Sequence, residues 1–225
     1  MAYILNLETA TTNCSVSIAK EGELMVLKEH NSANFSHAEQ LHVFIQEALE
    51  EAALQITQLN AIAVSKGPGS YTGLRIGVSA AKGLCFALNI PLISIPTLTS
   101  MAIQRKDTDA SFVIPVLDAR RMEVYSTVFN QKNEEVRGTE AEVINEDSFE
   151  EYEKQGKVLI LGSGAEKCLE PLRSKNIEFD TAIIPSAKEM CSLSYEKYAS
   201  NNFEDVAYFE PFYLKDFVLL TKKKK

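Results

Sequence analysis

The chain has 225 residues, 45% of them hydrophobic, with 31 acidic against 23 basic residues and a formal net charge of −8 at pH 7. This composition is typical of a globular protein with a hydrophobic core and excludes a disordered chain. The acidic balance argues against a protein that binds RNA through its overall charge, because such binding needs basic residues to replace counterions. A local basic patch is still compatible with the acidic overall charge.

Three features bear on location. No segment reaches the roughly 20 consecutive apolar residues of a membrane span. The first residues enter a strand pattern and lack the basic and long apolar regions of a signal peptide. Four scattered cysteines, at positions 14, 85, 168 and 191, form no C-x-x-C motif. We therefore expect a cytoplasmic protein with no membrane partner, whose cysteines are reduced core residues rather than zinc ligands.

The first half of the chain predicts a meander of three strands at residues 4–7, 14–19 and 23–27, followed by a helix. Ser36 is the expected N-cap of that helix, with Glu39 completing a capping box. Its apolar residues recur at helical spacing from Leu41 to Ala52. A buried strand at 61–64, a helix at 74–88, a strand at 91–95 and a helix opened by Pro96 follow.

The second half begins after a charged junction at residues 104–109. We expect a hairpin from strands at 112–117 and 122–129, a short helix near Ser148, and a strand at 158–161 that leads through 162–164 into a helix. A strand at 182–184 and a helix at 187–198 complete the pattern. The order predicts two related α/β halves with mixed sheets and packed helices. We expect subdomains at 1–105 and 106–225, with the last segment packing back on the first.

Two loops are weak candidates for a phosphate site. The loop at residues 67–73 joins a strand to a helix, yet it matches neither a Walker loop nor a dinucleotide-binding loop. It is either a phosphate cradle or a tight turn. Glu8 and the hydroxyls of Thr9, Thr11 and Thr12 form either a magnesium-phosphate site or a hydrogen-bonded polar turn. The cofactor candidates are Glu8, Thr9, Gly67 and Gly69.

The helix after this loop carries small residues in one row. Gly73, Gly77 and Ala81 lie at i, i+4 and i+8, so another backbone can approach closely along that side. Apolar side chains cover most of the remaining circumference. Such a helix is either the centre of the chain's own core or partly covered by another chain.

Other clusters argue against catalysis by this chain. His37 and His42 are five residues apart, and Leu41 stands where a second helical zinc ligand would be, so we expect no metal site. The turn that contains Asp118, Arg120, Arg121 and Glu123 is more typical of ion pairs than of a catalytic acid. No Ser-His-Asp set is recognisable.

Five segments together resemble one known family. They are residues 4–9, 36–41, 67–77, 118–125 and 211–214, and the string Gly-Pro-Gly-Ser-Tyr-Thr-Gly-Leu-Arg-Ile-Gly at 67–77 is the specific one. Their order is similar to that of the TsaB (YeaZ-like) family. The resemblance implies an actin/Hsp70/sugar-kinase-like (ribonuclease H-like) fold of two subdomains. It also implies a catalytic paralogue, TsaD, which transfers threonylcarbamoyl to tRNA adenosine, and a small ATPase, TsaE.

The resemblance also implies that the first two helices hold the paralogue. Glu8 departs from the aspartate usual in ATP-using members of this superfamily, which argues against nucleotide binding there. We expect a non-catalytic partner subunit that binds no cofactor tightly when isolated, while the complex uses ATP and contacts tRNA. Alone, the chain is expected to form a homodimer. The predicted interface residues are Ser36, His37, Gln40, Leu41, Phe44, Ile45, Tyr71, Thr72, Gly73, Arg75, Ile76, Gly77, Ala80 and Ala81.

This hypothesis predicts that Gly77→Leu blocks close helix approach and abolishes the complex. Two alternatives stay open. One is a stand-alone ATP-dependent transferase or kinase-like enzyme that uses Glu8 and the glycine loop. The other is a metalloprotease, against which the histidine spacing counts.

Overall fold

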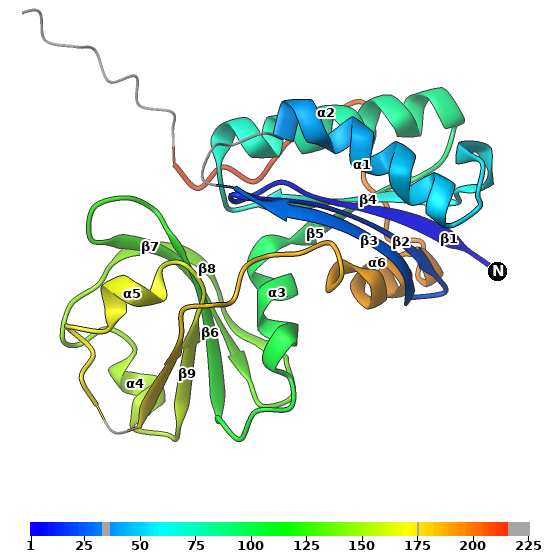
Figure 1. Ribbon diagram of the computed structural model, residues 1–225. Coiled ribbons are helices and arrows are strands. Elements are labelled where there is room, and N and C mark those ends of the chain that lie inside the picture. Colours follow the sequence, from blue (N-terminus) through cyan, green and yellow to red (C-terminus); the bar gives the residue numbers. More distant parts are fainter. Residues whose placement is uncertain (33–36, 175, 216–225) are drawn as a thin grey trace, which may run out of the picture.

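Two mixed sheets of five strands organise the computed structural model, which describes residues 1–32, 37–174 and 176–215 (Figure 1). The strand order is β3-β2-β1-β4-β5 in the first sheet and β10-β9-β6-β7-β8 in the second. Each sheet has three antiparallel strands in a meander and two parallel strands added beside the first of them. The two sheets therefore share one topology, and the prediction of two related α/β halves is confirmed.

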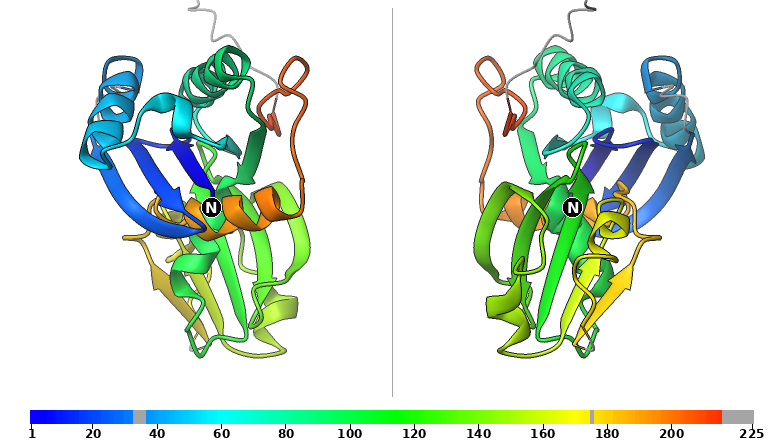
Figure 2. Two further views of the ribbon diagram at one scale, coloured as in Figure 1. Left: turned by 90° about the vertical axis from the view of Figure 1, so that its right-hand side faces the viewer. Right: turned by 90° about the vertical axis from the view of Figure 1, so that its left-hand side faces the viewer.

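The first sheet forms a lobe with three helices. Its strands are β1 (Tyr3–Glu8), β2 (Asn13–Lys20), β3 (Glu23–Asn31), β4 (Ala61–Gly67) and β5 (Leu92–Pro96). The helices α1 (His37–Glu51) and α2 (Tyr71–Leu88) cover one face, and α6 (Met190–Ala199) covers the other (Figure 2). A short 3-10 helix, Ile56–Gln58, connects α1 to β4. We call this unit the first lobe.

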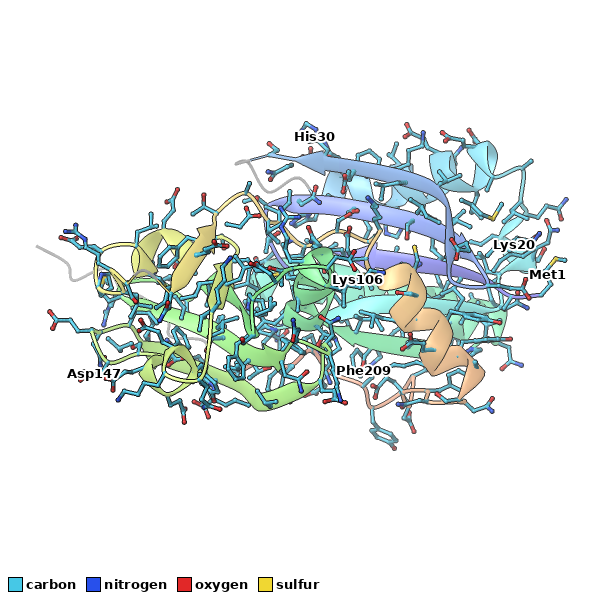
Figure 3. The ribbon with its side chains drawn as sticks, turned by 90° about the horizontal axis from the view of Figure 1, so that it is seen from below. Met1, Lys20, His30, Lys106, Asp147 and Phe209 are labelled. Carbon is cyan, nitrogen blue, oxygen red and sulfur yellow. The ribbon has the colours of Figure 1, made fainter. Side chains whose placement is uncertain are left out.

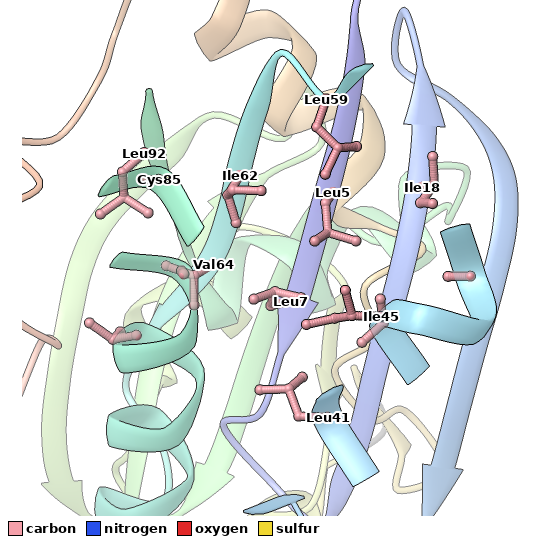
Figure 4. Packing of buried hydrophobic residues seen from close by; sticks show 14 of the residues in the cluster. Leu5, Leu7, Ile18, Leu41, Ile45, Leu59, Ile62, Val64, Cys85 and Leu92 are labelled. Carbon is pink, nitrogen blue, oxygen red and sulfur yellow. The ribbon is translucent and has the colours of Figure 1, made fainter. Parts of the chain in front are cut away.

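Period-two alternation in β1 divides the core of the first lobe. Leu5 and Leu7 face α1 and α2, where they join a buried cluster with Leu41 and Ile45 (Figure 4). Ile4 points to the opposite face and packs in the cluster that includes Met190 of α6. The apolar stripe of α1 and the three-strand meander were both predicted correctly, because each follows from local periodicity.

The second sheet forms the second lobe. Its strands are β6 (Phe112–Asp118), β7 (Glu123–Asn130), β8 (Glu135–Val143), β9 (Val158–Leu161) and β10 (Ile177–Asp180). Two one-turn helices flank it, α4 (Glu150–Glu153) and α5 (Ala165–Cys168). Helix α3 (Thr97–Ala102) begins after Pro96, as predicted, and contacts strands of both sheets. It continues into a 3-10 turn (Ile103–Arg105), which ends before Lys106 (Figure 3).

Two strand predictions in the second lobe are wrong. β8 lies in a stretch for which we predicted no strand. It is an edge strand with charged and half-exposed residues, so it lacks the apolar alternation of a buried strand. β10 forms at 177–180 instead of 182–184, because parallel pairing with β9 selects Ile177 and Phe179, while Ile183 is buried from a loop.

The segment after α6 returns along the first lobe. Glu204 forms an isolated bridge with Leu92 at the edge of β5, and the Lys82 Nζ of α2 donates to the carbonyl oxygens of Ala207 and Phe209, at 3.1 and 2.9 Å. Phe209 lies on this segment in Figure 3. We call residues 203–215 the strap.

All four cysteines are buried and unbridged, as predicted. Within the described ranges, no helix combines the length and the apolar character needed to span a membrane. The predicted N-cap Ser36 lies outside the described residues, and Glu39 is exposed in the first turn of α1.

Candidate functional site

The turn after β1 is bonded to the loop that opens α2. Ser70 is the N-cap of α2, and its side chain accepts a hydrogen bond from the Gly73 amide. The Ser70 amide in turn donates to the carbonyl oxygen of Ala10, at 2.6 Å. Gly67 has a φ of +104°, a conformation that other residues rarely adopt, and lies against the Phe212 carbonyl. The loop is therefore a tight turn packed against the chain's own backbone.

Thr9 fills the row of small residues on α2. Its Oγ1 donates to the Gly73 carbonyl at 2.8 Å, and a Cβ added at Gly73 or Gly77 would collide with Thr9 oxygens. Ala81 is fully buried in the same lobe. Of the two alternatives left open for this row, the structure favours the chain's own core, because the backbone that approaches Gly73 and Gly77 belongs to the same chain. Gly77→Leu would disrupt the lobe itself and cannot test an interface.

Glu8 is fully buried at the end of β1. Its Oε1 accepts hydrogen bonds from the Ala10 amide at 2.6 Å and from the Ser65 hydroxyl at 2.7 Å. Desolvation raises the pKa of Glu8 to about 7, although the amide and hydroxyl donors oppose this rise. A buried carboxyl group that caps its own turn, and that is harder to ionise than an exposed one, is a poor ligand for magnesium.

The four cofactor candidates are thus brought together, since Gly69 also lies against Ala10 and a Cβ there would overlap it. Glu8 and Gly69 both lie against Ala10, Gly67 lies against Gly69, and Thr9 is bonded to Gly73 at the end of the same loop. This arrangement favours the polar-turn interpretation of Glu8 and Thr9 over a phosphate cradle.

The two helical histidines occupy different environments. His37 is 1% exposed, and its Nε2 lies 2.7 Å from the Thr11 carbonyl oxygen. Burial lowers the pKa of His37. His42 is exposed on α1. Across the described part of the chain, no group of three or more His, Cys, Asp or Glu side chains is placed to hold a metal ion.

The charged turn between β6 and β7 makes its ion pairs with lysines from elsewhere. Asp118 pairs with Lys167 at 2.6 Å, and Glu123 pairs with Lys215 of the strap. An ion-paired turn was predicted, and both of its carboxylates form ion pairs. Arg120 and Arg121 are exposed, with left-handed φ values of 71° and 52°.

A shallow, largely apolar groove lies between α1 and α2. Its lining residues are His42, Ile76, Ser79, Ala80, Gly83 and Leu84. Gly83 is exposed, and a Cβ added there would meet nothing within 4 Å. Three of the six lining residues, Ser79, Ala80 and Gly83, are small, so a partner helix can approach closely at these positions. We call this surface the α1–α2 groove.

The predicted interface residues divide between this surface and the core. Thr72 and Arg75 are exposed, while Gln40, Phe44, Tyr71, Ile76 and Ala80 are half-buried. The buried ones are His37, Leu41, Ile45, Gly73, Gly77 and Ala81, and Ser36 lies outside the described residues.

Four groove residues were missed by the sequence interpretation: His42, Ser79, Gly83 and Leu84. Ser79, Gly83 and Leu84 follow Ile76 at i+3, i+7 and i+8, so helical spacing contains the signal. The spacing does not distinguish the row of Gly73, Gly77 and Ala81 from the row that contains Ser79 and Gly83. Only the structure shows which of the two faces solvent.

Comparisons with known proteins agree with one another. The family model described as "TsaD: tRNA N6-adenosine threonylcarbamoyltransferase" matches residues 31–218. The tRNA threonylcarbamoyladenosine biosynthesis protein TsaB of Haemophilus influenzae is 31% identical over 97% of this chain and 96% of its own length. The protein of the same name from Escherichia coli K12 is 28% identical over 97% of both chains.

Among solved structures, YeaZ from Pseudomonas aeruginosa superposes with a TM-score of 0.77 at 25% identity. The match covers 95% of this chain and all of that one. Together with the duplicated sheet topology, this confirms the expected two-lobed fold of the actin/Hsp70/sugar-kinase type.

Proposed function

The chain belongs to the TsaB (YeaZ-like) family of tRNA threonylcarbamoyladenosine biosynthesis proteins, and from this premise we propose that it is a non-catalytic partner subunit. Its partner is a catalytic TsaD-like paralogue, which it binds and stabilises through the α1–α2 groove. A TsaE-like ATPase and the tRNA join through the assembled complex.

The matching family model supports the choice of partner. That model describes the threonylcarbamoyltransferase and matches residues 31–218, so we expect a transferase of the same family to share the fold and to carry helices equivalent to α1 and α2. Two copies of one fold can pair these helices about a pseudo-twofold axis, with the same patch used on both sides. The same reasoning supports a homodimer when the paralogue is absent.

The α1–α2 groove is the observation that carries the proposal. Its lining is apolar apart from His42 and Ser79, and it is open to solvent between two helices of an otherwise well-packed lobe. Small residues at Ser79, Ala80 and Gly83 allow close helix packing, which shape-complementary interfaces need. Exposed Val43 on α1, 50% accessible, adds apolar surface that a partner helix would remove from water.

The turn after β1 supports the non-catalytic part of the proposal. A subunit that held magnesium-bound ATP there would need an ionised carboxylate and a loop with free amides. Glu8 is instead buried and engaged with Ala10 and Ser65, and the Ser70 amide is bonded to Ala10. We accordingly assign ATP use to the complex and no tightly bound nucleotide to the isolated chain.

Light scattering on the purified chain, alone and mixed with the TsaD-like protein of the same cell, tests the proposal. We expect a new species with one copy of each protein. Gly83→Leu should abolish it, because the Cβ position of Gly83 has no heavy atom within 4 Å and the added side chain occupies the groove. Gly138→Leu is the matched control, since Gly138 lies on the edge strand of the second lobe and has only a Glu135 oxygen near its Cβ position, at 3.6 Å.

Two results would overturn the proposal. One is the absence of a complex with wild-type protein at tens of micromolar, with and without ATP. The other is normal complex formation by a folded Gly83→Leu variant. Tight ATP binding by the isolated chain that Glu8→Ala removes would favour the stand-alone enzyme.

A further inference from the structure

Two adjacent arginines occupy the tip of the β6–β7 hairpin in conformations that cost free energy. Arg120 and Arg121 both have positive φ, where a Cβ is crowded and where glycine or asparagine is favoured. Tight hairpin turns commonly use positive φ at their central positions and favour glycine or asparagine there, so the turn accounts for the backbone but not for the arginines. Strained non-glycine positions also cluster at functional sites. The choice of two arginines at this turn therefore calls for a functional explanation.

Neither arginine makes an ion pair with any residue that the structure describes. The two carboxylates beside them are already occupied, Asp118 by Lys167 and Glu123 by Lys215. The hairpin tip thus presents two guanidinium groups in excess of its local acidic charge, although the whole chain has a net charge of −8. An anionic partner could therefore form salt bridges with both arginines without competing with an existing one.

Aromatic rings and cations continue from this tip onto the first lobe. The Lys215 Nζ lies 5.9 Å from the centre of the Tyr125 ring in β7. Two residues earlier in the strap, the Tyr213 ring packs against the Tyr71 ring in a tilted arrangement, with ring centres 4.9 Å apart and an interplanar angle of 36°. The Arg75 guanidinium lies over the Tyr71 ring, at 4.3 Å. Figure 1 shows the end of the strap beside the β6–β7 hairpin, which agrees with the Lys215–Glu123 pair.

This alternation of guanidinium groups and partly exposed rings is suited to one kind of ligand. Arginine binds phosphates bidentately, and bases of unpaired nucleotides stack on tyrosine rings and on guanidinium planes. Tyr213 is 36% exposed and Met122, next to Arg121, is 47% exposed, so apolar area is open beside the charges. A membrane surface or an acidic peptide would use the charge but not the stacked rings.

We propose that the surface formed by Arg120, Arg121, Lys215, Tyr213, Tyr71 and Arg75 binds an unpaired stretch of RNA. The arginines of the hairpin tip contact the phosphates, and Tyr213 of the strap, which packs on Tyr71 and is 36% exposed, presents the ring on which a base stacks. The chain then contributes a direct RNA contact to its complex. The use of a tRNA-like probe rests on the proposed function, whereas the site itself does not.

The test measures binding of a fluorescently labelled RNA stem–loop with an unpaired loop to the isolated chain and to its complex with the paralogue. The variant Arg120→Asn/Arg121→Gly removes both charges and places residues that tolerate positive φ in the turn, so it should fold at least as well as the wild type. We expect roughly tenfold weaker binding, and a plot of log affinity against log salt whose slope is shallower by about 2. The control Lys154→Gln/Arg173→Gln removes two exposed charges elsewhere on the second lobe and should leave both values unchanged.

Three outcomes would overturn the proposal. The first is RNA binding by the Asn/Gly variant with wild-type affinity and salt slope, or no RNA binding by either wild-type sample. The second is arginine-dependent binding of inorganic triphosphate without RNA binding, which would assign the tip to a small anion. The third is a variant that loses the paralogue and keeps RNA, which would assign the arginines to a protein contact. The isolated-chain measurement stands even where no complex forms, so this proposal and the partner-subunit proposal can fail separately.

Discussion

Thr9 and Gly73 join the first turn of the chain to the second helix. The Thr9 Oγ1 donates to the Gly73 carbonyl oxygen at 2.8 Å, across 64 positions of sequence. The same hydroxyl occupies the space that a side chain at Gly77 would need. The small residues of this row therefore serve the packing of the lobe, and the surface row that contains Gly83 stays open to a partner.

Gly77→Ala should destabilise the chain by about 1–3 kcal/mol, because the new methyl group displaces the Thr9 hydroxyl and its hydrogen bond. Gly83→Ala should instead stabilise it by up to about 1 kcal/mol through helix propensity alone. Urea unfolding of both variants measures the difference. The cause is checked with Thr9→Ala, which removes the hydroxyl: in that background Gly77→Ala should cost markedly less. If Gly77→Ala lowered the stability equally in both backgrounds, the contact between Gly77 and the Thr9 hydroxyl would be contradicted.

Glu8 should make the stability of the chain fall as pH rises. Its pKa of about 7 in the folded state lies above the reference value of 4.5. The folded state therefore keeps a proton that the unfolded state releases between these two values. The contribution to stability is complete below pH 4.5 and declines up to about pH 7, by about 3 kcal/mol at most.

Glu8→Gln mimics the neutral carboxyl group and should remove this decline, so the variant should be more stable than the wild type above about pH 7. Urea unfolding midpoints across this pH range measure it. Glu39→Gln, which alters an exposed carboxylate in α1, is the matched control and should leave the wild-type profile in place. An unchanged profile in Glu8→Gln would show that Glu8 is not the group responsible.

The isolated chain should show no saturable binding of magnesium-ATP at micromolar concentration in calorimetry, because Glu8 and the Ser70 amide already have partners within the chain. Titration of the complex under the same conditions is the comparison, and heat should be observed there. Tight binding to the isolated chain that is lost in Glu8→Ala would contradict the closed-turn interpretation and favour an enzyme.

Lys82→Ala should loosen the strap. The Lys82 ammonium donates to the Ala207 and Phe209 carbonyl oxygens, so its removal leaves both acceptors without that donor. Hydrogen exchange of amides in residues 205–209 should become faster, by roughly tenfold for a loss of about 1.4 kcal/mol. Lys188→Ala, an exposed cation before α6, is the control. Unchanged exchange in the strap would mean that other contacts hold it in place.

Local sequence signals determined much of the first lobe. The meander of β1 to β3, the apolar stripe of α1 and the entry of α3 after Pro96 follow from alternation, helical spacing and the restricted φ of proline. Five segments in one order also identified the family, which the comparisons confirm. The polar edge strand β8 escaped notice, since charged residues at a sheet edge leave no apolar period.

Tertiary structure alone decided which residues are available for function. Helical spacing marks both small-residue rows of α2, but only the placement of Thr9 determines that Gly77 is buried and Gly83 is free. In the same way, the sequence brings Asp118 and Arg120 together, while the fold pairs Asp118 with Lys167 and brings Lys215 to Glu123. Periodicity records the relation of a residue to its own helix or strand. Exposure and pairing depend on segments far away in the chain, whose positions are set by packing.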